Sequence, residues 1–103
     1  MKTVLWPAKD PAEKVWATFD YGAALEPGEV IQSAAIGVSL KQGTDAAPAA
    51  ILASAAVLLA GGRVTQRIQG GVDGAAYLVR CAATTSTERV LLLAGVLPVE
   101  AIT

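Results

Sequence analysis

Alternating hydrophobic and polar positions predict most of the regular structure of this chain. The clearest case is the strand expected over residues 75–83, because every second side chain there belongs on the same face. One face carries Ala75, Tyr77, Val79 and Cys81. The preceding stretch, Gly70-Gly71-Val72-Asp73-Gly74, has the glycines that a chain reversal with positive φ requires. We expect this strand to be central, with the others packed around it.

Shorter stretches of the same period predict further strands at residues 15–21, 30–40, 63–69 and 89–96. In the first, Val15, Ala17, Phe19 and Tyr21 share one side; in the third, Val64 and Ile68 face inward and Arg67 outward. Glu26-Pro27-Gly28-Glu29 fits a type II turn. Gly37 inside the second strand predicts a bulge or the close approach of another backbone.

The run Ala49–Ala60 is ambiguous. Its Ala and Leu content suits a helix, and periodicity alone does not separate a buried helix from a buried strand. Because Gly61-Gly62 and strand patterns flank the run, we favour two short strands or one bent strand, near residues 51–53 and 57–59.

Together these elements predict an all-β fold, an immunoglobulin-like antiparallel β-sandwich of about seven short strands with an extended N-terminal arm. Tyr77 follows its turn as the corner tyrosine of such sandwiches does, where the hydroxyl hydrogen-bonds back to the loop. The alternative is a half-buried strand aromatic. We divide the chain into an arm (1–14), a sandwich domain (15–98) and a C-terminal tail (99–103).

The arm carries two prolines and Trp6, and Trp16 follows shortly after it. Pro7 and Pro11 favour extended backbone before them, and Asp10-Pro11-Ala12-Glu13 fits a single helical turn with Asp10 as its N-cap. Trp6 and Trp16 are large anchors for packing, either on the domain itself or on another protein.

Composition points to contacts with other chains. Of 103 residues, 53% are hydrophobic and only 17% are charged, so part of the apolar surface stays uncovered. The net charge of −1 without a basic run argues against nucleic-acid binding. The start of the chain is not a signal peptide, and no apolar run reaches the ~20 residues of a membrane helix. These features predict a soluble protein made in a reducing cytoplasm, without membrane contact.

The usual groups of catalysis and metal binding are missing. The chain has no His, and its one cysteine, Cys81, belongs to the core face of a strand. The nine acidic residues are scattered and do not form a calcium loop. We therefore expect no enzyme activity, no cofactor and no bound metal.

An ordered set of residues resembles the phage fibre–tail adaptor proteins, small virion proteins of tailed bacteriophages. The first part is Trp6-Pro7-Ala8-Lys9-Asp10-Pro11-Ala12-Glu13, followed by Asp20-Tyr21, Leu25, Gly28-Glu29-Val30-Ile31 and Ser33. The second part is Gly70-Gly71, Gly74-Ala75-Ala76-Tyr77 and Glu88-Arg89. The departures are Tyr21 for Trp, Glu29-Val30 for Asp-Thr and Glu88 for Gly.

The resemblance implies a non-catalytic structural protein of the virion. Such a protein joins tail fibres or neighbouring subunits to the tail or connector, in several copies around the tail axis, after synthesis in the host cytoplasm. The alternative is a capsid decoration protein or another non-catalytic binding module. The candidate interface residues are Trp6, Pro7, Lys9, Asp10, Pro11 and Trp16.

Overall fold

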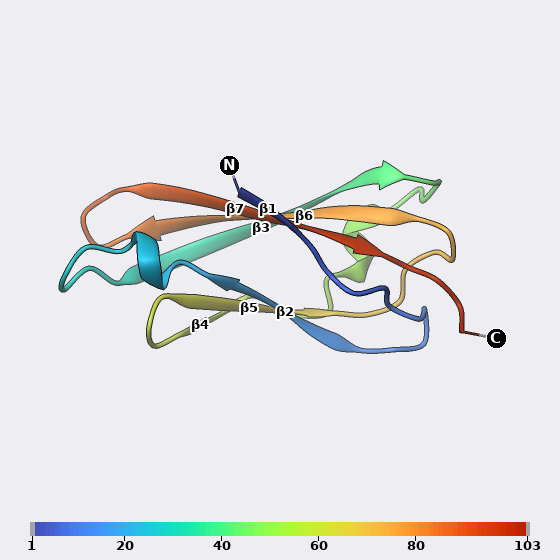
Figure 1. Cartoon of the computed structure of the whole chain (residues 1–103), viewed down its shortest axis with the longest axis horizontal. Helices are drawn as coiled ribbons and strands as arrows, with labels where there is room; N and C mark the ends of the chain where they lie inside the picture. Colours follow the sequence, from blue (N-terminus) through green and yellow to red (C-terminus); the bar gives the residue numbers. More distant parts are fainter. Residues whose placement is uncertain (1, 103) are drawn as a thin grey trace.

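The computed structural model describes residues 2–102 (Figure 1). Within this range the chain forms seven β-strands and two short 3-10 helices, without an α-helix. The strands are β1 (Lys2–Leu5), β2 (Val15–Asp20), β3 (Ile31–Gln42), β4 (Val57–Leu59), β5 (Arg63–Ile68), β6 (Ala76–Thr85) and β7 (Val90–Pro98), and the helices are η1 (Gly22–Ala24) and η2 (Pro48–Ile51). The prediction of an all-β fold is confirmed. No helix in this range is long and apolar enough to cross a membrane.

The strands form two stacked sheets in an elongated molecule of 47 × 20 × 20 Å. The four-stranded sheet has the order β1-β7-β6-β3 and the three-stranded sheet the order β2-β5-β4, shown as upper and lower layers in Figure 1. The sandwich prediction is confirmed, whereas the immunoglobulin-like assignment stays a prediction. One pair departs from the expected antiparallel arrangement, because β1 runs parallel to β7.

β6 is the central strand, as its alternation predicts. It lies between β7 and β3 and pairs antiparallel with both. Tyr77, Val79, Cys81 and Ala83 are fully buried, and Arg80 on the opposite face is exposed. These side chains meet the inward residues of the other sheet, which are Ala17, Phe19, Val64 and Ile68. The core thus lies between the sheets and consists mainly of small and branched side chains.

Tyr77 makes the hydrogen bond expected of a corner tyrosine. Its hydroxyl accepts a bond from the Val72 N–H (2.9 Å) and donates one to Asp45 Oδ2 (2.7 Å). The loop before β6 is therefore fixed to the strand that it feeds. Gly70, Gly71 and Gly74 in this loop all have positive φ, as predicted.

The N-terminal segment is extended, but it is bound to the domain. Residues 2–5 form an edge strand of the four-stranded sheet, and Lys9 makes an isolated bridge to Val99. Between them, the Trp6 N–H donates to the Val96 carbonyl (2.9 Å). The tail also starts inside the fold, because Val99 is only 1% exposed.

Two local predictions need correction. The bulge expected at Gly37 is absent: β3 and β6 stay in register there, and their irregularities lie at Ile31/Ser33 and Leu40/Gln42. Neither does another backbone approach; the nearest atom to a Cβ at Gly37 would belong to the Arg80 side chain, 3.8 Å away. In the ambiguous run, a strand does form at Val57–Leu59, but no strand forms at residues 51–53: η2 ends at Ile51, and Leu52 makes only an isolated bridge to Ile68. Pro48 at the first position of η2 explains this, because its fixed φ suits a helical start.

Candidate interface at the N-terminal segment

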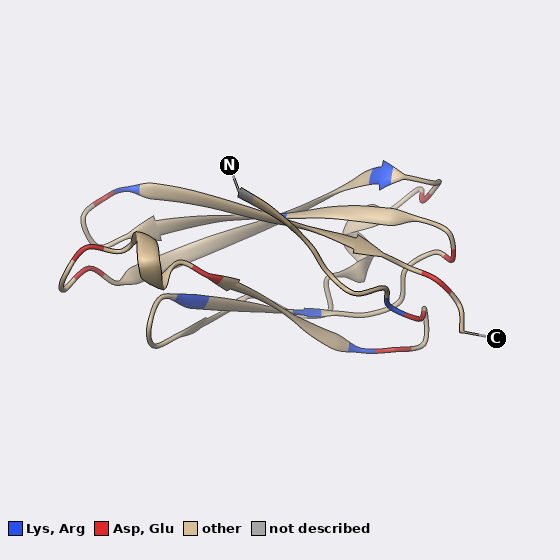
Figure 2. Cartoon of the chain, viewed as in Figure 1, with Lys and Arg blue, Asp and Glu red and all other residues tan. Residues whose placement is uncertain are grey.

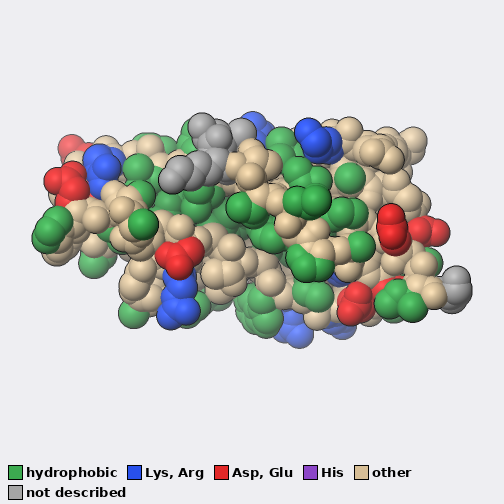
Figure 3. Space-filling model, in the orientation of Figure 1, with side chains coloured by type: hydrophobic (Ala, Val, Ile, Leu, Met, Phe, Trp, Pro, Cys, Tyr) green, Lys and Arg blue, Asp and Glu red, His purple; other side chains and the backbone are tan. Residues whose placement is uncertain are grey.

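A groove of about 470 Å³ lies between the N-terminal segment and the edge strand β2. Four of the six candidate interface residues line this groove: Trp6, Pro7, Lys9 and Trp16. The other lining residues are Ala8, Glu13, Val15, Ala17, Thr18, Ile68 and Leu97. Figure 3 shows hydrophobic side chains gathered across the middle of the face on which the N-terminal segment lies. Such a groove can accept apolar side chains of another protein.

Trp6 forms one wall of the groove and also packs on the core. Its ring meets Phe19 edge to face, with 5.5 Å between centroids and 67° between planes. The indole lies over Gly95 of β7, where an added Cβ would overlap it. Gly95 is thus the residue that lets the indole come this close to the sheet.

Trp16 remains largely uncovered, with 56% of its surface exposed. It lies on the outward side of β2, and the Arg67 guanidinium is 5.7 Å from its ring centroid. Because β2 is an edge strand, both this indole and the adjacent strand edge are open to a partner.

The Lys9 side chain is buried and binds within the chain. It is 2% exposed, and its Nζ donates hydrogen bonds to the carbonyls of Gly70 (2.7 Å) and Asp10 (2.8 Å). Burial lowers the pKa of Lys9 from its ordinary value, partly offset by Glu13 and Asp10. This side chain connects the N-terminal segment to the turn before β6.

Asp10 and Pro11 belong to the predicted turn and do not line the groove. Asp10 Oδ1 accepts a bond from the Ala12 N–H (2.8 Å), and Glu13 Oε1 accepts one from the Asp10 N–H (2.8 Å). Asp10 Oδ2 accepts a further bond from Ile102 (2.8 Å), so the turn also holds the C-terminal tail. The backbone N–H groups of Ala12 and Ile102 lower the pKa of Asp10. Pro11 lines a different hollow, next to Gly70 and Gly71.

Sequence reasoning missed the floor of the groove. Ile68 and Leu97 are inward residues of β5 and β7, and nothing in the alternation shows that the N-terminal segment passes beside them. The only sequence signal was the arm's own tryptophan, which needs an apolar surface to pack on.

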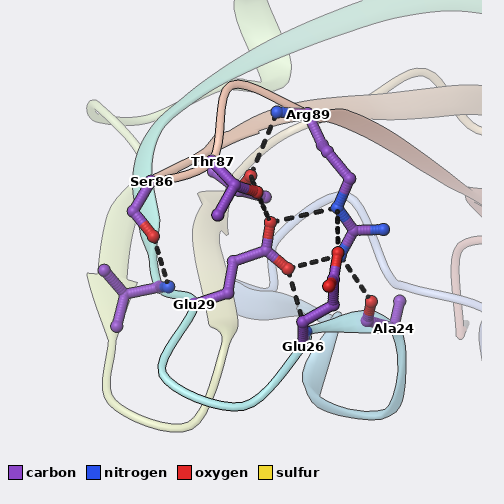
Figure 4. Close-up of polar contacts among 8 residues, drawn as sticks. Ala24, Glu26, Glu29, Ser86, Thr87 and Arg89 are labelled. Atoms are coloured by element: carbon purple, nitrogen blue, oxygen red, sulfur yellow. Dashed lines mark hydrogen bonds and ion pairs between the residues drawn. The ribbon is translucent and has the colours of Figure 1, made fainter.

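At the left-hand end of the molecule in Figure 1, Glu29 and Arg89 join the loop before β3 to the β6–β7 turn (Figure 4). The Arg89 guanidinium bonds both carboxylate oxygens of Glu29, its Nη2 donates to the Ala24 carbonyl (2.8 Å), and the Thr87 hydroxyl donates to Glu29. Glu29 is 6% exposed. The Arg89 guanidinium, followed by the hydroxyls of Thr85 and Thr87, holds the pKa of Glu29 well below its ordinary value. This cluster stabilises a loop.

Glu88 in this turn has a φ of 65°, the only positive value among the non-glycine residues described. The Thr85 N–H bonds the Arg89 carbonyl (2.9 Å), which is the pattern of a three-residue hairpin whose last loop residue is left-handed. Glycine adopts this conformation at no steric cost, which accounts for the glycine of the resembling proteins at this position.

The comparisons with known proteins agree with a structural role. A family model described as "Podophage GP4 fiber-tail adaptor protein gp77" matches residues 9–97. No curated protein matches the chain. In the part of the chain that the structure describes, no group of three His, Cys, Asp or Glu side chains is placed to hold a metal ion.

Proposed function

Because the chain belongs to the podophage GP4 fibre–tail adaptor family, we propose that it is a non-catalytic virion protein that joins tail fibres or neighbouring subunits to the phage tail. Several copies around the tail axis would each use the groove between the N-terminal segment and β2. The chain would be made in the host cytoplasm and then incorporated into the particle.

The observation that carries this proposal is the family match over residues 9–97. The groove supports the proposal with a contact surface: Trp16 is 56% exposed on an edge strand, beside a hollow that Trp6 and Pro7 also line. Indole side chains that are open in the free protein are typical anchors of protein interfaces. Seven of the nine carboxylates, and the buried Lys9, already bind within the described chain, and this favours assembly over catalysis.

Trp16→Ala tests the proposed contact. We expect the purified variant to unfold at nearly the same temperature as the wild type, because the indole lies mainly outside the core. Its content in purified particles should fall about tenfold or more, the effect of losing a hot-spot contact. Val57→Ala, on the same outward face but away from the groove, is the matched control and should be incorporated normally.

Three results would contradict the proposal. Particles that lack the wild-type chain would exclude a virion role altogether. Normal incorporation of Trp16→Ala would exclude the groove as the contact. Labelling of the chain by antibody on the capsid surface, away from the tail, would favour the alternative of a decoration protein.

A further inference from the structure

The outward face of the four-stranded sheet is unusually apolar. Cross-strand register places its side chains in rows across β3, β6, β7 and β1. The rows are Ser33-Thr84-Val90, Ala35-Ala82-Leu92, Gly37-Arg80-Ala94-Thr3 and Ser39-Leu78-Val96-Leu5. Val90, Leu92 and Leu5 are 61%, 50% and 75% exposed. Arg80 is the only charged residue in these rows.

Arg80 stands in the middle of this face without a partner. Among the described residues, its guanidinium takes part in no ion pair and no hydrogen bond. It lies across Gly37, beside a hollow of about 190 Å³ whose lining also includes Ala35, Ala82 and Leu92. The small residues thus leave a concave, apolar floor next to an unpaired positive charge.

The outward face of the three-stranded sheet is different. There, Asp20 is in register with Arg63, and Trp16 with Arg67. Figure 2 likewise shows most charged residues at the turns and on the lower layer, with little charge along the middle of the upper layer. The outward face of the three-stranded sheet also exposes apolar side chains at Trp16, Val57 and Leu59, but they stand among the charged residues Asp20, Arg63 and Arg67. The rows across the four-stranded sheet carry one charge only, and an apolar face of this extent is typical of a surface that is covered in the assembled state.

The charge of Arg80 identifies what covers it. A second copy packed face to face would bring two Arg80 side chains into one apolar interface, and an unpaired buried charge is strongly destabilising. A partner with a carboxylate opposite Arg80 would instead make a charge-assisted, bidentate hydrogen bond in a desolvated site. We propose that this face docks on another virion protein, through an apolar surface that carries one Asp or Glu side chain opposite Arg80.

This inference rests on the proposed function, and a charge reversal tests it. Particles are made with Arg80→Glu, Arg80→Lys or Arg63→Glu in the full chain, and the chain is quantified in purified particles. Arg80→Glu should be depleted about tenfold or more, because like charges in an interface cost several kcal/mol and ~1.4 kcal/mol is tenfold. Arg80→Lys should retain most incorporation, and Arg63→Glu, on the other outward face, should match the wild type.

Two further measurements complete the test. The unfolding temperature of purified Arg80→Glu should equal that of the wild type, since Arg80 makes no bond within the described chain. Suppressors of Arg80→Glu, selected by serial passage, should replace an Asp or Glu in a different virion protein with a neutral or basic residue.

The outcomes separate cleanly. Normal incorporation of Arg80→Glu overturns the inference while leaving the adaptor role intact. Suppressors at acidic residues of this chain would also overturn the inference and leave that role intact, because they would identify a second copy as the partner. An unfolded Arg80→Glu variant would overturn it as well, because Arg80 would then serve the fold. Absence of the wild-type chain from particles would overturn the proposed function, and this inference with it.

Discussion

Gly95 and Trp6 should be strongly coupled in their effect on stability, because the indole occupies the space where a side chain at position 95 would lie. Trp6 is partly buried, and its edge-to-face contact with Phe19 adds to its packing. Partial burial of a Trp removes about 100–150 Å² from water, or ~2.5–4 kcal/mol at ~25 cal/mol/Å² as an upper estimate. We therefore expect Trp6→Ala to lower the free energy of unfolding by about 2–4 kcal/mol.

Gly95→Ala should be nearly as destabilising, since its methyl group expels the same ring. In the double variant the ring is already gone, and alanine is favoured over glycine in a strand by roughly 0.5–1 kcal/mol. The double variant should thus be no less stable than Trp6→Ala, with a coupling energy of at least about 2 kcal/mol, the smallest loss expected of Gly95→Ala alone. Urea unfolding followed by circular dichroism measures all four proteins. Additive losses, with a double variant far less stable than either single one, would refute the packing of Trp6 on Gly95.

Two further predictions concern the end of the molecule at the β6–β7 turn. Glu88→Gly should raise the free energy of unfolding by about 0.5–1 kcal/mol, because relief of the left-handed strain exceeds the added entropy of the unfolded chain. Glu88→Ala keeps the strain and should not raise the free energy of unfolding. Equal unfolding midpoints for the two variants would contradict this prediction. Because the fold lowers the pKa of Glu29, its ionised carboxylate stabilises the fold at pH values above the ordinary pKa of 4.5, and this stabilisation is lost as the pH falls below that value. In urea unfolding, the stability deficit of Glu29→Gln relative to the wild type should therefore shrink in acid. A deficit that is the same at neutral and acid pH would show that the Glu29 charge does not matter.

Strand alternation predicted the interior of the fold well. Inward and outward residues of β2, β5 and β6 lie as expected, because one buried face fixes the register of a strand. The hydrophobic pattern did not predict secondary structure where the sequence has no clear period. The apolar run Ala49–Ala60 looks the same as helix or strand, and only the position of Pro48 distinguishes its 3-10 start. The bulge predicted at Gly37 was wrong because a glycine in a strand can also make room for a side chain that lies over it.

Long-range polar contacts were beyond the reach of the sequence. Glu29 and Arg89 are 60 positions apart, and scattered charges give no indication of which ones meet. Both did occur in the stretches that resemble the adaptor family, so their pairing explains two of those positions physically. The same limit applies to Lys9, whose acceptor carbonyl at Gly70 lies 61 positions away. Lys9 was predicted as an interface residue because it belongs to the N-terminal arm, and the structure shows its Nζ donating two partly buried hydrogen bonds within the chain.

The two tryptophans show why an exposed interface and a stable fold are compatible in so small a domain. Trp6 is fixed against Phe19 and Gly95, so the wall that it contributes to the groove is rigid before any partner arrives. Trp16 is the opposite case: it adds little to the core and leaves an apolar surface and a strand edge open. A rigid wall reduces the entropy lost on binding, and an open indole supplies the area that is buried. The open edge of β2 is tolerable because the strand is only six residues long, with the charged Lys14 beside it and Asp20 at its end.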